Sequence, residues 1–102
     1  LFQRSCDLGL GFGFNVFAAS MLIRMLAQQC SYEPGELIWQ GGDVHLYLNH
    51  AELVEEQLSR TPAGDPKLHL LRKPDSIFGY EIEDFEVLDY QPQAHISAPV
   101  AV

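Results

Sequence analysis

The stretch Asn15-Val-Phe-Ala-Ala-Ser-Met-Leu-Ile-Arg-Met-Leu-Ala-Gln-Gln29 predicts the central element of this chain, one long helix. Its apolar residues cover nearly the whole circumference of such a helix; they are Val16, Phe17, Ala19, Met21, Leu22, Ile23, Met25 and Leu26. A helix that is apolar all round is typical of a protein core. We therefore expect a buried core helix, preceded by a loop at Gly9, Gly11 and Gly13 because glycine tolerates unusual backbone angles.

Strand-like segments lie on both sides of this helix. Residues 1–6 are expected to form the end of a strand. Beyond the helix, residues 36–40 and 44–48 are expected to be strand segments around the Gly41-Gly42 pair. Glycines inside a strand indicate a bulge or a close approach of another backbone.

The last half of the chain predicts a second helix and further strands. Asn49, with Glu52 after it, is typical of an N-cap and capping box for a helix that ends near Ser59. Residues 67–71 and the alternating residues 77–90 predict strands. This order of elements indicates an α+β fold, with a mixed sheet and a buried core helix.

Composition limits the class of protein. The chain has 102 residues, enough for one small domain over residues 1–102, and 47% of them are hydrophobic. The net charge of −8 disfavours nucleic acids and anionic membranes as partners.

Glycines and polar residues interrupt the apolar residues 8–27, which therefore do not predict a membrane span. Because Leu1 opens inside a strand-like stretch, we expect a piece of a longer chain.

The chain has two cysteines, Cys6 and Cys30, which are not at a metal-ligand spacing. A disulfide framework would need more cysteines and a secretory context, so the pair favours free thiols in a reducing cytosol. His45 and His50 lie near each other without a third ligand at a suitable spacing, and we assign no metal.

The first polar cluster is Arg4-Ser5-Cys6-Asp7. At a strand end, the Arg4 guanidinium and the Ser5 hydroxyl are suited to a phosphate, although a surface salt bridge between Arg4 and Asp7 is the commoner arrangement. A neighbouring cation lowers the pKa of a thiol, which makes Cys6 a candidate nucleophile. No local feature supports that role.

Two further clusters allow a structural and a binding interpretation. Asn15 is either the N-cap of the helix or an amide whose donor and acceptor match the edge of a pyrimidine. His45 and Tyr47 are two residues apart, so on a strand they face the same side and both can bond a sugar hydroxyl. His45 is alternatively a general base or an ordinary core histidine.

Several blocks of this sequence, in order and over almost its whole length, resemble the C-terminal portion of thymidylate synthase. They are Gln3-Arg-Ser-Cys-Asp7, Phe14-Asn15, Met25-Leu-Ala-Gln-Gln-Cys30, Gly41-Gly-Asp-Val-His-Leu-Tyr47 with Asn49-His50, Arg72-Lys-Pro74, Ile77-Phe78, Glu83-Asp-Phe85 and Ala98-Pro-Val-Ala-Val102. Two of these blocks, Arg-Ser-Cys-Asp and Gly-Gly-Asp-x-His-x-Tyr-x-Asn-His, are highly specific to that family.

The resemblance implies a cytoplasmic, homodimeric enzyme that methylates dUMP with 5,10-methylenetetrahydrofolate as one-carbon and hydride donor. It implies that dUMP is bound by Arg4, Ser5, Cys6, Asp7, Asn15, His45 and Tyr47, and that folate contacts Asp7 and Ala101. Asn15 would pair with uracil, whereas an aspartate there would suit cytosine. A deoxyuridylate hydroxymethylase and a non-catalytic nucleotide-binding remnant are the alternatives.

The chain also departs from the family pattern. The family's catalytic cysteine lies in a Pro-Cys-His stretch that this sequence does not contain, so no catalytic residue is assigned here. The phosphate arginines of the N-terminal part and of the partner subunit are absent too, which fits the acidic balance. Gly13 stands where proline is common, and Gly9 replaces a bulkier residue. We expect the piece alone to be inactive.

Overall fold

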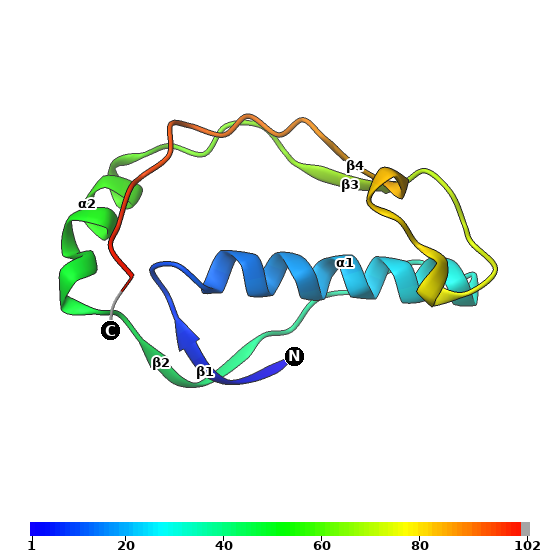
Figure 1. Cartoon of the computed structure of the whole chain (residues 1–102), viewed down its shortest axis with the longest axis horizontal. Helices are drawn as coiled ribbons and strands as arrows, with labels where there is room; N and C mark the ends of the chain where they lie inside the picture. The colour runs from blue at the N-terminus through cyan, green and yellow to red at the C-terminus, as the bar shows by residue number, and fades with distance from the viewer. Residues whose placement is uncertain (101–102) are drawn as a thin grey trace.

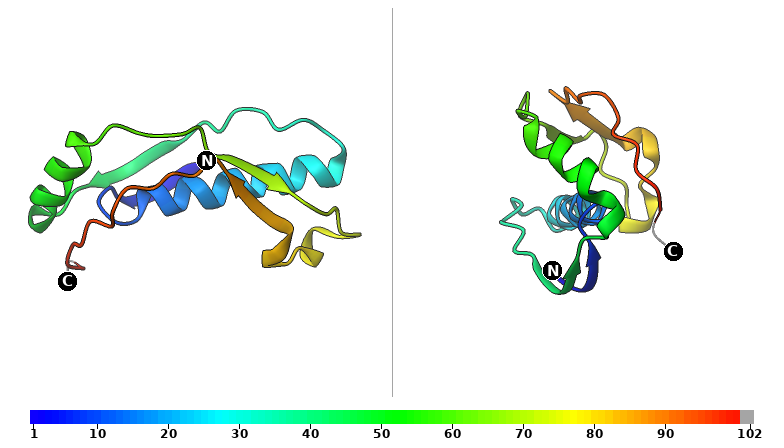
Figure 2. Two further views of the ribbon diagram at one scale, coloured as in Figure 1. Left: turned by 90° about the horizontal axis from the view of Figure 1, so that it is seen from above. Right: turned by 90° about the vertical axis from the view of Figure 1, so that its left-hand side faces the viewer.

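The computed structural model describes residues 1–100 and has one long helix at its centre, with strands on either side (Figure 1). The helices and strands are β1 Phe2–Asp7, α1 Phe12–Cys30, β2 Gln40–His45, α2 Ala51–Ser59, β3 Lys67–Leu70 and β4 Phe85–Leu88. Seen along the molecule, β1 and β2 lie below α1, and β4 lies above it (Figure 2). The α+β class is as the sequence predicts.

The strands form two separate sheets. β1 and β2 pair in parallel, from Phe2 opposite Gln40 to Asp7 opposite His45. β3 and β4 pair antiparallel, and no strand pairing joins the two sheets within residues 1–100. The prediction of one mixed sheet is therefore wrong, because α1 lies between the two strand pairs and keeps their edges apart.

The long helix forms where the sequence predicts it, with wider limits. It begins after Gly11 and so contains Gly13, and it ends at Cys30, followed by the cap residue Ser31 in a left-handed conformation with φ of 57°. The Ser31 and Tyr32 N–H groups donate to the last carbonyls, as in the common C-terminal cap. The expected burial is wrong, since no residue of α1 is buried and the Phe14 side chain is 80% exposed.

The open shape of the described chain explains this exposure. The accessible surface is 7822 Å² and the radius of gyration is 16.1 Å. A compact chain of this size has about 5,800 Å² of accessible surface and a radius of gyration of about 13 Å. Among the described residues, Cys6 of β1 is the one hydrophobic residue that is buried. Residues 1–100 therefore supply too little packing to cover both sides of α1.

The paired glycines lie inside β2, and residues 36–39 before them are not a strand. A Cβ built on Gly42 would lie 2.9 Å from the carbonyl oxygen of Arg4. This distance confirms the predicted close backbone approach, because a side chain at that position would push β1 away from β2.

The start of the second helix differs from the prediction. Residues Leu48–His50 form a 3-10 turn, and the N-cap of α2 is His50 without a side-chain hydrogen bond. The Asn49 capping box is therefore wrong, since the 3-10 turn places Asn49 before the cap. The predicted end at Ser59 is confirmed. No helix within residues 1–100 combines the length and the apolar character needed to cross a membrane.

Most of residues 77–90 are not a strand. Two 3-10 turns, Ile77–Gly79 and Ile82–Asp84, precede the short β4. Hydrogen bonds to the Asp84 carboxylate keep this part of the chain turned rather than extended. Asp84 is 6% exposed, accepts from the Glu81 N–H at 2.8 Å and forms a two-pronged contact with Arg72. The hydrogen bond from Arg72 holds the pKa of Asp84 below its ordinary value, and the Glu81 N–H adds to this.

We predict that the 102-residue chain, expressed by itself, melts without a sharp cooperative transition, because the apolar side chains along α1 remain in water. Circular dichroism during heating, together with dye binding to apolar surface, measures this. A sharp cooperative melt of a soluble monomer would contradict the prediction.

A second prediction concerns the Arg72–Asp84 pair. A depressed pKa stabilises the fold at pH values above the ordinary aspartate value of 3.8, and the stabilisation is lost as pH falls through the lower folded value. In the protein expressed from its complete reading frame, Arg72→Met should lower the melting temperature near pH 7 by several degrees. The difference from the parent protein should shrink as the pH is lowered through 3.8. Arg24→Met, on the exposed side of α1, is the matched control.

Candidate functional site

The parallel register of β1 and β2 brings two of the sequence clusters together. Asp7 at the end of β1 lies opposite His45 at the end of β2. The pairing continues into the turn, where the Leu8 N–H donates to the His45 carbonyl at 3.0 Å and the Gly11 N–H donates to the Asp7 carbonyl at 3.0 Å. The carboxyl ends of both strands and the N-terminal end of α1 therefore meet at one place.

Asp7 organises the turn between β1 and α1. Its Oδ1 accepts from the Gly9 N–H at 2.9 Å and from the Leu10 N–H at 3.4 Å. Oδ2 has no hydrogen-bond partner among residues 1–100, and the side chain is 25% exposed. The carboxylate is thus held in one orientation with one oxygen available to a ligand.

Asn15 lies in the first turn and a half of α1, next to Asp7. Its N–H donates to the Gly11 carbonyl at 3.0 Å, so Gly11 rather than Asn15 precedes the helix, and the N-cap interpretation is wrong. A Cβ built on Gly11 would lie 3.6 Å from Asn15 Nδ2 and 3.7 Å from the Asp7 Cβ. The Asn15 side chain is exposed and makes no hydrogen bond within the described residues, which leaves its donor and acceptor free.

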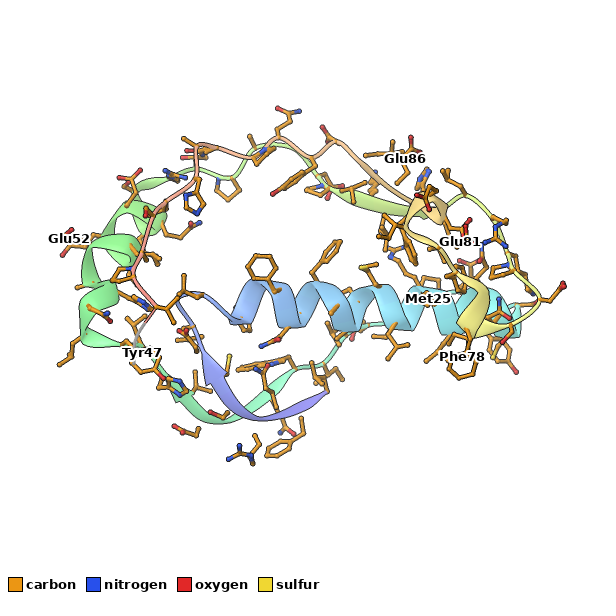
Figure 3. The ribbon with its side chains drawn as sticks, in the orientation of Figure 1. Met25, Tyr47, Glu52, Phe78, Glu81 and Glu86 are labelled. Carbon is orange, nitrogen blue, oxygen red and sulfur yellow. The ribbon has the colours of Figure 1, made fainter. Side chains whose placement is uncertain are left out.

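His45 and Tyr47 pack against each other although Tyr47 lies beyond the end of β2. Their rings meet edge to face with centroids 5.2 Å apart. His45 Nδ1 lies 3.3 Å from the Asp43 carbonyl oxygen and 3.7 Å from the Asp43 carboxylate. Figure 3 shows Tyr47 where β2 passes into α2, far along the molecule from Met25 on α1.

The candidate phosphate residues do not lie on one face of β1. The register with β2 steps evenly by one residue, so successive side chains alternate between faces. Ser5 shares a face with Asp7, whereas Arg4 points to the other face with Cys6. Arg4 is exposed and forms no ion pair with Asp7, which excludes the salt bridge between them in this structure.

The two thiols differ sharply in exposure. Cys6 is 1% exposed and Cys30 is exposed at the far end of α1. A ligand at the carboxyl end of β1 can therefore touch the backbone of Cys6 more easily than its sulfur. Neither thiol is placed to attack a ligand beside Asn15 and His45.

His50 is a member of the site that residue patterns alone did not single out. It is fully buried, its ring meets Tyr47 edge to face at 5.7 Å, and its Nδ1 lies 3.9 Å from Asp7 Oδ1. The available signal was its place at the end of the Gly-Gly-Asp-x-His-x-Tyr-x-Asn-His block. Its contacts depend on the 3-10 turn before α2, which the residue pattern does not predict.

Away from the residues around Asp7, the described chain offers a weaker case for a ligand or metal site. Residues 1–100 contain no cluster of three histidine, cysteine or acidic side chains that could hold a metal. An open groove of about 350 Å³ lies away from the site, between the C-terminal half of α1 and β3. Ala101, the expected folate contact, lies outside the described residues.

The sequence of this chain matches one family of known proteins over its whole length. Residues 1–102 match the protein family described as thymidylate synthase. The thymidylate synthases of Novosphingobium aromaticivorans and Sphingopyxis alaskensis are each 69% identical to this chain, and that of Rhizobium rhizogenes is 58% identical. These alignments cover 100% of the chain and 32%, 33% and 33% of the three relatives. The chain thus spans about a third of their length.

Proposed function

Because this chain belongs to the thymidylate synthase family, we propose that it forms part of an enzyme that converts dUMP to dTMP with 5,10-methylenetetrahydrofolate. The observation that best supports the proposal is the register that sets Asp7 beside His45 at the start of α1. We infer from it that Asp7, Asn15, His45 and Tyr47, which come from three separate segments, contribute to one polar site.

Asn15 is the group that we assign to the base. An amide offers one donor and one acceptor side by side, and the edge of uracil offers the complementary pair. The side chain is free of hydrogen bonds within the described residues, so binding would break none there. Aspartate would present two acceptors instead, which leaves the uracil carbonyl without a donor.

His45 and Tyr47 are assigned to the deoxyribose 3′ hydroxyl. Their edge-to-face packing restricts the rotamers of both rings, so less conformational freedom is lost on binding. The Tyr47 hydroxyl has no partner among the described residues and is available as donor or acceptor.

Arg4 and Ser5 are assigned to the phosphate, with Cys6 as a neighbouring backbone contact. A guanidinium on a long flexible stem can curl around the edge of β1 toward the Ser5 face, and Arg4 has no competing ion pair within residues 1–100. With a net charge of −8, the chain offers few cations for a dianion. Further arginines would come from a partner subunit of a homodimer or from family segments outside this chain.

Asp7 is assigned to the folate as well as the nucleotide, and Ala101 to the folate. The free Oδ2 of Asp7 can accept from N–H groups of a pterin-like ring. The folate supplies the one-carbon unit and the hydride, while the residues of this chain bind and orient. The attacking thiol that adds to carbon 6 of uracil is not assigned to Cys6 or Cys30.

We predict that the protein expressed from its complete reading frame forms dTMP from dUMP and methylenetetrahydrofolate, and that the 102-residue chain alone forms none. Mass spectrometry of the nucleotide product measures both. A hydroxymethylated product would instead favour the hydroxymethylase. Binding of dUMP without turnover would favour the non-catalytic remnant, and dTMP formed by the chain alone would contradict the assignment of the nucleophile.

Substitution of Asn15 tests the contact with the base. Asn15→Asp should lower kcat/KM for dUMP at least about a hundredfold, because a site that pairs with one hydrogen-bond pattern discriminates strongly against its mismatch. The binding of dCMP should improve relative to dUMP. Asn49→Asp makes the same chemical change at an exposed position in the 3-10 turn and serves as control. Equal losses in both variants would show that added charge, not base pairing, is responsible.

A further inference from the structure

The ring of His50 connects the C-terminal tail, residues 91–100, to the site. Its Nε2 lies 2.8 Å from the Pro99 carbonyl oxygen. A carbonyl oxygen only accepts, so Nε2 must carry a proton and donate it. The side chain is fully buried, which shields this bond from competition by water.

The opposite edge of the ring, at Nδ1, lies close to Asp7 and Gly9. Nδ1 is buried without a hydrogen-bond partner in the described chain and lies 3.9 Å from Asp7 Oδ1. A Cβ built on Gly9 would lie 2.5 Å from the same nitrogen. The ring therefore occupies space that any residue other than glycine at position 9 would take.

The tail has two anchor regions, and His50 provides the second. Near α2, the Gln93 side chain donates to the Thr61 carbonyl at 2.8 Å, and Arg60 donates to the Ala94 carbonyl. The tail then passes α2 and ends near the turn between β1 and α1 (Figure 1). Among residues 95–100, the contact of His50 with Pro99 is the one hydrogen bond within the described residues.

Tyr47 links this anchor to the proposed sugar contact. Its ring packs edge to face on His45 at 5.2 Å and on His50 at 5.7 Å. A displacement of the His50 ring would therefore remove its packing contact with Tyr47 as well as its hydrogen bond to the Pro99 carbonyl.

We propose that His50 is a positioning residue that fastens the C-terminal tail across the site and supports the ring of Tyr47 beside it. The expected effect on turnover rests on the proposed function. The effect on the tail does not, because it depends only on the bond between the His50 ring and the Pro99 carbonyl.

The first test measures the rate at which a broad-specificity protease cleaves within residues 95–100 of the ligand-free protein, expressed from its complete reading frame, with mass spectrometry of the fragments. His50→Leu should speed this cleavage about tenfold, because the loss expected for one buried hydrogen bond raises the population of the detached tail by that factor. His50→Gln, which keeps an Nε2 donor, should restore it to within about threefold of the parent protein. His69→Leu makes the same change at an exposed histidine of β3 and should leave the tail unaltered. An unchanged cleavage rate in His50→Leu would overturn the proposal.

Gly9→Ala gives an independent answer if His50→Leu does not fold. This variant retains the histidine, but the added Cβ displaces the ring at Nδ1, so the protease should again cleave the tail faster. Slow cleavage at the parent rate in Gly9→Ala would count against a tail held by the His50 ring.

Steady-state kinetics form the second test. In His50→Leu the KM for the folate should rise about tenfold and change more than kcat, with partial recovery in His50→Gln. If the parent protein shows no turnover of dUMP, the proposed function fails, while the cleavage rates still decide the role of His50. Faster cleavage of the tail with an unchanged KM would refute the part of the proposal that concerns the site.

Discussion

The parallel pairing of β1 with β2 is the constraint on which the rest of the site depends. It requires the backbone of Gly42 to approach the Arg4 carbonyl so closely that a Cβ would lie 2.9 Å from it. A shift of this pairing by one residue would reverse the faces and separate Asp7 from His45. The Trp39 indole supports the same register, since its Nε1 donates to Gln3 at 3.0 Å while its ring packs on Phe12 of α1.

The long helix has the composition of a core element without a core around it in residues 1–100. Its first turn positions Asn15 beside Asp7, and its last turn is tied to the segment after β3, where Gln29 donates to the Pro74 carbonyl at 2.9 Å. Between these ends, side chains such as Phe17 and Leu22 are about half exposed. Local hydrogen bonds thus hold the ends of α1 in place, whereas burial of its apolar surface requires more protein than the described chain supplies.

Sequence patterns predicted the elements whose signals are local. The apolar run of α1, the end of α2 and the close approach at Gly42 are each encoded by a few adjacent residues. The failures have long-range causes. Asp84 attracts Arg72 and turns a predicted strand into a 3-10 segment, and an expected single sheet is divided by α1. The grouping of Asp7, His45 and His50 depends on pairing across most of a helix and a loop, which periodicity does not report.

The position of His50 shows how a short turn can connect distant parts of the chain. Had Asn49 capped α2, the ring of His50 would have entered the helix instead of standing before it. The 3-10 turn places that ring between Asp7 and Pro99, which are 92 positions apart in the sequence. A buried imidazole can donate a hydrogen bond from Nε2 to the Pro99 carbonyl, and no aliphatic residue of similar volume can do so. The geometry therefore gives histidine at this position a role that packing alone does not explain.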